Sequence, residues 1–179
     1  MLYNGNVIIP PMRKLILLLA LLIIGCSSVQ KLEVKSAFSD GGKIPKVYTL
    51  DGKDLSPPLE FPNLSPKARS IAIIVIDPDA HDFVHWIIWD IPPVKSIPEG
   101  IPHGHEISKP FHAYQGKNDF GRYGYDGPYP PKGQTHRYVF KVYVLDTVLN
   151  LKDASLRELM DAMKGHVIQY GEITGYYGR

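Results

Sequence analysis

Cysteine is almost absent from this chain of 179 residues, which contains only Cys26. Without a second thiol the chain forms no internal disulfide, so its fold has to be stabilised by packing. A charge excess is also absent: the formal net charge is +2, and it falls to zero if the segment with Arg13 and Lys14 is removed. A balanced surface argues against broad nucleic-acid binding, which needs concentrated positive charge.

Familiar catalytic motifs are missing too. The sequence has no HExxH, no GxSxG and no spare cysteine nucleophile. No serine or threonine is obviously placed as a nucleophile for His85 or His136, the histidines that the strand pattern below singles out. These absences disfavour metalloproteases and serine or cysteine hydrolases. We therefore expect a protein that is not an enzyme.

The amino-terminal segment predicts export. Arg13 and Lys14 precede an apolar run, Leu15 to Ile24, that is too short to span a bilayer comfortably and suits a secretory signal. Its Ile-Ile-Gly-Cys end resembles the lipobox of bacterial lipoproteins, in which cleavage leaves the cysteine lipidated. We expect a signal peptide over 1–25, a lipidated tether over 26–30, and one domain over 31–179 of a membrane-anchored lipoprotein of the cell envelope.

Two alternatives stay open for this segment. One is an ordinary signal peptide, and the other is a membrane anchor with an incidental cysteine. Pro10 and Pro11 suit no signal start, so the natural start is left open between Met1 and Met12.

Short apolar runs predict a mainly β domain. The runs 70–76 and 83–91 are rich in β-branched and aromatic residues and are bounded by prolines, as buried strands are. A six-residue connection suits a hairpin, which would bring Asp77 and His85 to one sheet edge. Strict alternation would place Phe83, His85, Ile87 and Trp89 on one face and Val84, Trp86, Ile88 and Asp90 on the other. Weaker patterns predict a first strand at Leu32 and Val34 and another over 47–50.

A loop and a strand next to each other predict a shaped site. Residues 116–133 combine glycines, prolines and aromatic rings, and 136–146 then switch to an alternation with His136, Tyr138 and three further apolar residues on one face. The rings either wall a pocket or cover the end of a sheet, and we favour a pocket because functional side chains often lie on loops held by a rigid scaffold.

The carboxyl-terminal region holds the only convincing helix signal. Ser155 and Glu158 form a capping-box pattern, followed by a helical stripe of apolar residues that predicts a helix to about residue 170 and a short strand over 173–177. The stripe is typical of core packing, so we expect no cofactor there.

Several long motifs in this order resemble the phosphatidylethanolamine-binding protein family, in particular its bacterial and archaeal, Raf kinase inhibitor-like branch. They are DPDA from Asp77, FVHWIIWDIP from Phe83, GKNDFGRYGYDGPYPPKGQTHRYVF from Gly116 and AMKGH from Ala162. The resemblance covers nearly the whole predicted mature chain. One departure is His81, where the family usually has proline.

The resemblance implies an antiparallel Greek-key β-sandwich with a carboxyl-terminal helix and a small anion-accepting pocket at one end. Matching the family's pocket motifs to this sequence, with two neighbouring tyrosines, gives the expected ligand-binding residues: Asp77, His85, Tyr123, Gly127, Pro128, His136 and Tyr138. Family members bind phosphate and phospholipid head groups, and some eukaryotic members inhibit kinases. Imidazole N–H donors and close-approaching glycine amides suit such an anion.

Three classes of function are compared. We favour non-catalytic binding of a small phosphorylated or zwitterionic ligand, such as phosphate or a phospholipid head group. The second is an envelope protein-interaction or inhibitor module. The third and least favoured is an enzyme, since two histidines and an aspartate can bind a metal or act in acid–base hydrolysis. We expect no nucleic-acid partner and no bound metal.

Overall fold

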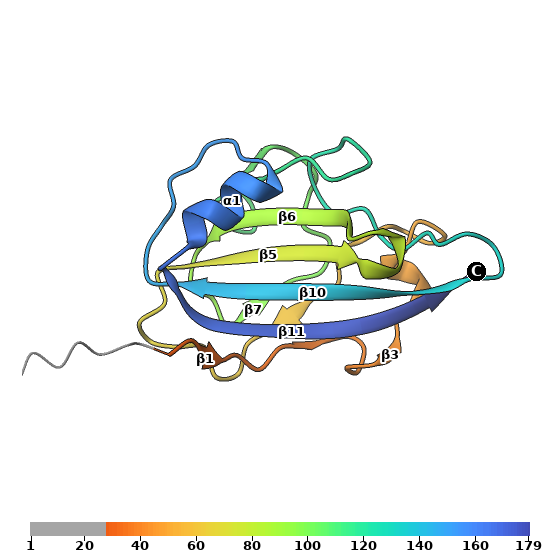
Figure 1. Cartoon of the computed structure of the whole chain (residues 1–179), viewed down its shortest axis with the longest axis horizontal. Coiled ribbons are helices and arrows are strands. Elements are labelled where there is room, and N and C mark those ends of the chain that lie inside the picture. The colour runs from red at the N-terminus through yellow and green to blue at the C-terminus, as the bar shows by residue number, and fades with distance from the viewer. Residues whose placement is uncertain (1–27) are drawn as a thin grey trace, which may run out of the picture.

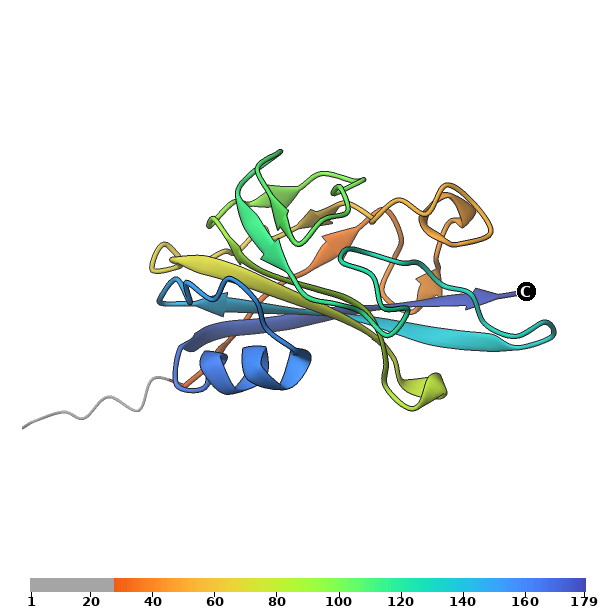
Figure 2. The ribbon, with the colours of Figure 1, turned by 90° about the horizontal axis from the view of Figure 1, so that it is seen from above.

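The computed structural model describes residues 28–179, so the predicted signal peptide and Cys26 lie outside the described residues. The domain is mainly β, with two sheets and one α-helix, as predicted. Figure 2 shows the three layers: the small sheet lies over one face of the large sheet, and the helix α1 (Leu156–Met163) lies over the other. In the described part of the chain, no helix is both long and apolar enough to cross a membrane.

The larger sheet has eight strands in the order β1-β11-β10-β5-β6-β9-β8, with β3 paired to β11. Pairing is antiparallel except where β1 and β3 join β11. Its strands are β1 (Gln30–Lys31), β3 (Gly42–Lys43), β5 (Ser70–Asp77), β6 (Phe83–Ile91), β8 (Glu106–Ile107), β9 (Ala113–Gln115), β10 (Thr135–Leu145) and β11 (Val167–Gly178).

The smaller sheet has three antiparallel strands in the order β2-β4-β7. They are β2 (Lys35–Ser36), β4 (Leu59–Glu60) and β7 (Ser96–Ile97), and two 3₁₀ turns complete the described elements, η1 (Lys46–Tyr48) and η2 (Pro78–Ala80). No α-helix occurs between residue 28 and residue 150, as the prolines predict.

Two apolar cores flank the large sheet. All eight residues of β5 are buried, which explains the uninterrupted apolar run from Ile71 to Ile76 within it. On the face toward the small sheet, Trp86, Tyr138 and Phe140 belong to one core, and on the other face Ile74, Trp89 and Leu159 of the helix belong to the second. The predicted strands 70–76, 83–91 and 136–146 are thus confirmed as the centre of the fold (Figure 1).

The weak strand predictions near the amino terminus are wrong. The chain leaves β1 after Lys31 and enters β2 at Lys35, so the stretch with Leu32 and Val34 crosses from one sheet to the other. Residues 46–48 form the turn η1, because both the amide and the hydroxyl of Thr49 bond to the carbonyl of Lys46. This local bonding competes with strand pairing.

The helix prediction is right at its start and wrong at its end. Ser155 and Glu158 form the capping box, but α1 ends at Met163 and not near residue 170. Gly165 takes a left-handed conformation with φ of 79°, and the following residues form the twelve-residue strand β11 rather than a short strand over 173–177. Pairing along the whole of β10 overrides the helical stripe.

Candidate functional site

Asp77 ends β5 and organises the turn that follows. Its side chain is buried, and Oδ1 accepts the amides of Asp79 at 2.9 Å and Ala80 at 3.1 Å, which caps η2. His81 and Asp82 then adopt positive φ values of 58° each, so the residue that departs from the family's proline lies in a left-handed turn that proline cannot adopt. Asp77 is thereby held at the sheet edge with Oδ2 free for another partner.

That partner is His136. The second residue of β10 lies 8% exposed, and its Nδ1 is 2.7 Å from Oδ2 of Asp77. Its Nε2 is 3.0 Å from Oε1 of Gln134. Both ring nitrogens therefore face oxygen acceptors, an arrangement that two N–H donors satisfy.

His85 reaches the same region through a β-bulge. Val75 pairs with Trp86 while Ile76 pairs with Val84, so His85 is the extra residue on β6. The predicted alternation therefore fails here: Val84 packs in the helix-side core with Ile87, and the ring of His85 packs edge-on against Tyr138 with centroids 5.1 Å apart.

His85 is buried among aromatic rings, and its direct hydrogen-bond partner is a neutral main-chain oxygen. Its Nδ1 is 2.6 Å from the main-chain oxygen of Asp126, and the rings of Phe83 and Phe120 lie 5.3 and 5.5 Å away. Burial lowers the pKa of His85 below its ordinary value of 6.5, and the nearby carboxylates only partly oppose this.

Tyr138 connects the two histidines. It lies two residues after His136 on the same face of β10, and its ring packs against His85. Burial first, and the Asp77 carboxylate second, raise the pKa of Tyr138, so its hydroxyl stays protonated across the neutral range. The group formed by Asp77, His85, His136 and Tyr138, called the histidine site below, lies where β5 ends and β6 and β10 begin (Figure 1).

The Gly127-Pro128 turn borders this region, but the glycine amide is hydrogen-bonded to a residue outside the histidine site. The Gly127 N–H donates to Oδ1 of Asp54 at 2.7 Å, and Pro128 accepts from the Leu50 amide at 3.2 Å. A Cβ on Gly127 would collide with the main-chain oxygen of Tyr48, so only glycine fits. The turn shapes the wall, and its glycine amide already has a protein acceptor.

Tyr123 lies in a different place from the other predicted ligand residues. Its ring packs against His105 at 4.9 Å, and the Lys117 ammonium lies 5.5 Å from its centroid. It lines a cavity of about 650 Å³ between the 117–123 loop and the start of α1. No described contact joins it to the histidine site.

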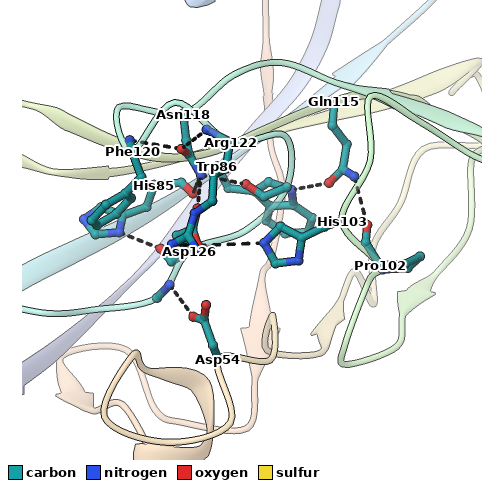
Figure 3. Close-up of polar contacts among 12 residues, drawn as sticks. Asp54, His85, Trp86, Pro102, His103, Gln115, Asn118, Phe120, Arg122 and Asp126 are labelled. Atoms are coloured by element: carbon teal, nitrogen blue, oxygen red, sulfur yellow. Dashed lines mark hydrogen bonds and ion pairs between the residues drawn. The ribbon is translucent and has the colours of Figure 1, made fainter.

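Sequence reasoning missed the buried polar network beside His85 (Figure 3). The Asp126 carboxylate is fully buried, and Oδ2 accepts from Asn118 Nδ2 at 2.5 Å and from Arg122 Nε at 3.1 Å. Its Oδ1 faces a second nitrogen of Arg122 and lies 3.8 Å from His103 Nε2. An aspartate before Gly-Pro is typical of a turn. The only sequence signal for the network was the four-residue spacing of Asn118, Arg122 and Asp126.

Neither a metal site nor an activated hydroxyl is found in the part of the chain that the structure covers. Within residues 28–179 no group of three or more His, Cys, Asp or Glu side chains is arranged to hold a metal ion. Over the same residues, no serine or threonine hydroxyl hydrogen-bonds to His85 or His136, whose described partners are the main-chain oxygen of Asp126 and the side chains of Asp77 and Gln134.

Comparisons with known proteins agree with this architecture. A UPF0098 protein of Pyrococcus horikoshii is 51% identical, with 96% of this chain and 93% of the relative aligned, and one of Pyrococcus abyssi is 49% identical over 94% and 99%. A crystal structure from Chlamydia trachomatis, described as a phosphatidylethanolamine-binding protein homolog, has a TM-score of 0.74 and 36% identity, covering 84% of this chain and 99% of that one.

A second solved structure and a family model complete the comparison. YbcL of Escherichia coli, described as a new member of the mammalian PEBP family, has a TM-score of 0.72 and 28% identity, over 83% of this chain and 99% of YbcL. The family model described as phosphatidylethanolamine-binding protein matches residues 34–178, which is nearly the whole described domain. This chain therefore belongs to the phosphatidylethanolamine-binding protein family.

Proposed function

We propose that the domain binds, without catalysis, a small anionic or zwitterionic ligand such as phosphate or a phospholipid head group at the histidine site. The observation that carries the proposal is the meeting of Asp77, His85, His136 and Tyr138 at one end of the sandwich, from three strands. Family membership supports an oxyanion as the ligand.

The chemistry of the site suits both signs of charge. Tyr138 supplies a hydroxyl that stays protonated, and His136 supplies an N–H at Nε2 once Gln134 gives way. The Asp77 carboxylate supplies negative charge for an ammonium group, while its bond to His136 offsets repulsion of a phosphate. A zwitterionic head group matches this pattern better than a bare anion.

Calorimetric titration with glycerophosphoethanolamine tests the proposal. This phosphodiester keeps its phosphate charge fixed between pH 8 and 6, so a change in affinity reports the protein. Binding should tighten as pH falls over that range, because a protonated imidazole can donate from both ring nitrogens to a phosphate oxygen.

Variants at the two histidines locate the site. His85→Ala and His136→Ala should each weaken binding about tenfold or more and remove most of the pH dependence, as loss of a charge-assisted hydrogen bond does. His166→Ala, at a half-exposed histidine paired with Asp146 outside the site, is the matched control and should bind normally. Unchanged affinity in both test variants would place the ligand elsewhere.

We also propose that the protein is exported and anchored by lipid at Cys26, from the charged start, the apolar run and the Ile-Ile-Gly-Cys end. Cys26→Ser should move the protein from the membrane fraction toward the soluble fraction in detergent-free washes. Stable anchoring needs more than one acyl chain. Equal membrane retention of both forms would show that lipid on Cys26 is not the anchor.

A further inference from the structure

The direction of the hydrogen bond made by Nδ1 of His85 is fixed by its partner. The partner is the main-chain oxygen of Asp126 at 2.6 Å, and a carbonyl oxygen only accepts hydrogen bonds. Nδ1 therefore carries the proton. In the neutral ring, Nε2 is then a lone-pair acceptor, and no hydrogen-bond partner for it is found among the described residues.

The partner carbonyl cannot turn away, because Asp126 is held on every side. Its amide donates to the main-chain oxygen of His85 at 3.1 Å, so the two residues are bonded in both directions. Its buried carboxylate is bound by Asn118 and by Arg122, whose guanidinium contacts both oxygens (Figure 3). The next residue, Gly127, is bonded to Asp54.

The neutral form of the ring prevails at neutral pH. The charged groups around His85 are Asp77 from β5 and Asp119 and Asp126 from the loop, and Tyr138 faces it from β10 as an uncharged phenol. These carboxylates favour the imidazolium, but burial outweighs them and lowers the pKa of His85. At pH 7 and above, Nε2 thus offers a lone pair rather than a proton.

We propose that the histidine site selects ligands that present a hydrogen-bond donor to Nε2 of His85, such as a protonated phosphate or an ammonium group, and rejects oxyanions that carry no proton. The inference rests on the proposed function and adds a requirement to it. Asp126 is the positioning residue, because its main-chain oxygen fixes the tautomer and Arg122 and Asn118 fix its carboxylate. A lone pair of an oxyanion facing the lone pair of Nε2 is repelled and leaves both unpaired.

Inorganic phosphate and sulfate are the matched probes. The two are tetrahedral and similar in size, but phosphate keeps at least one O–H at pH 7.5 and sulfate has none. Calorimetric titration of the full-length protein at pH 7.5 should show phosphate binding at least about tenfold more tightly than sulfate. The preference should shrink once the pH is low enough to protonate His85, because Nε2 then donates a hydrogen bond to a sulfate oxygen.

Glycerophosphoethanolamine and glycerophosphocholine separate the two sources of a donor. Both are phosphodiesters with one positive group, but only the ethanolamine form has ammonium N–H donors. Tighter binding of the ethanolamine form at pH 7.5 would show that a head group can supply the donor in place of a phosphate proton. A larger preference for inorganic phosphate over both would assign the donor to the phosphate itself.

Two variants connect the preference to named atoms. His85→Ala should abolish the phosphate preference, leaving both anions weak. Arg122→Gln removes the guanidinium that holds the Asp126 carboxylate from its solvent-exposed side, and it should reduce the preference for phosphate over sulfate at pH 7.5. If Arg122 had a purely structural role, the variant would change stability and leave the ratio of the two affinities unchanged. Nitrogen-15 NMR of the histidine rings reads the tautomer directly in the unmodified protein and does not depend on either variant folding.

The outcomes separate this inference from the proposed function. Equal binding of phosphate and sulfate that His85→Ala weakens for both would leave anion binding standing and overturn the donor requirement. An Nε2–H tautomer of His85 at pH 7.5 would overturn it whatever binds. If neither the anions nor the two phosphodiesters bind at the histidine site, the proposed function fails and the donor requirement fails with it.

Discussion

His85 and His136 read alike in the sequence, since each begins a core strand beside aromatic residues, yet the fold gives them opposite partners. His136 is paired with a carboxylate, Oδ2 of Asp77, at 2.7 Å. His85 is paired with a neutral main-chain oxygen at 2.6 Å, in a shell of aromatic rings. The comparison teaches that the partner atom, and not the histidine, sets whether a site offers charge or a directed lone pair.

The largest expected effect comes from removing the charged partner. Asp77→Ala deletes the acceptor of His136 Nδ1 and the cap of η2 together, in a buried place. Breaking a buried pair by removing one member costs about 3 kcal/mol or more. Chemical denaturation at pH 7 should show a loss of that size in the free energy of unfolding.

Asp79→Ala is the matched control two residues away. Asp79 pairs with Arg137 at 2.8 Å, but both side chains are substantially exposed, so the loss should stay below about 1 kcal/mol. If the two variants lost equal stability, the carboxylate of Asp77 would be no more important to the fold than a surface charge, and the contrast between the two histidines would lose its structural basis.

Much of this arrangement could be predicted from the sequence where local pattern and tertiary context agree. The run Ile71 to Ile76 is apolar throughout because β5 is covered on both faces. Residues 136–146 alternate because β10 is buried on one face and only partly covered on the other. The hairpin connection after Asp77 could likewise be predicted, from six residues with turn chemistry.

The rest of the fold and of the site depends on tertiary contacts that a short sequence pattern does not reveal. The bulge at His85 adds one residue to β6 and reverses which neighbours share its face. The stripe that continues past Gly165 suits a helix equally well, and only pairing with β10 decides for a strand. Asp126 reads as a turn residue, and its burial follows from Arg122 and Asn118 converging on it.

A smaller effect is expected on how the free energy of unfolding depends on pH, because His85 is buried against a neutral partner. Because folding lowers the pKa of His85, the unfolded chain binds more protons than the folded one once pH falls below about 6.5. The contribution of this group is fully present above pH 6.5 and is lost as pH falls toward the folded-state pKa. Stability of the natural protein should therefore decline over that window.

His85→Asn keeps a donor for the Asp126 oxygen and removes the titration. Its stability, followed by denaturant unfolding between pH 7.5 and 5, should fall less steeply than that of the natural protein. His81→Asn, at an exposed histidine whose left-handed backbone conformation asparagine also adopts, serves as the control and should keep the natural slope. An unchanged slope in His85→Asn would mean that His85 is not the buried neutral group described above.

The smallest expected effect is that of removing metal ions and adding reductant. This experiment tests whether a single metal ion is bound by both histidines. If one metal were bound by His85 and His136, neither ring would depend on the protein partner assigned to it, because metal ligation would set both tautomers. The apolar cores supply the stability of the domain, and Cys26 lies outside the described residues. Thermal melting with and without chelator and reductant should therefore give the same midpoint within about 1 °C, since even 1 kcal/mol would move the midpoint by several degrees in a domain of this size. A large drop with chelator alone would give the two histidines a common ligand, overturn the contrast between them, and favour the metal-dependent alternative.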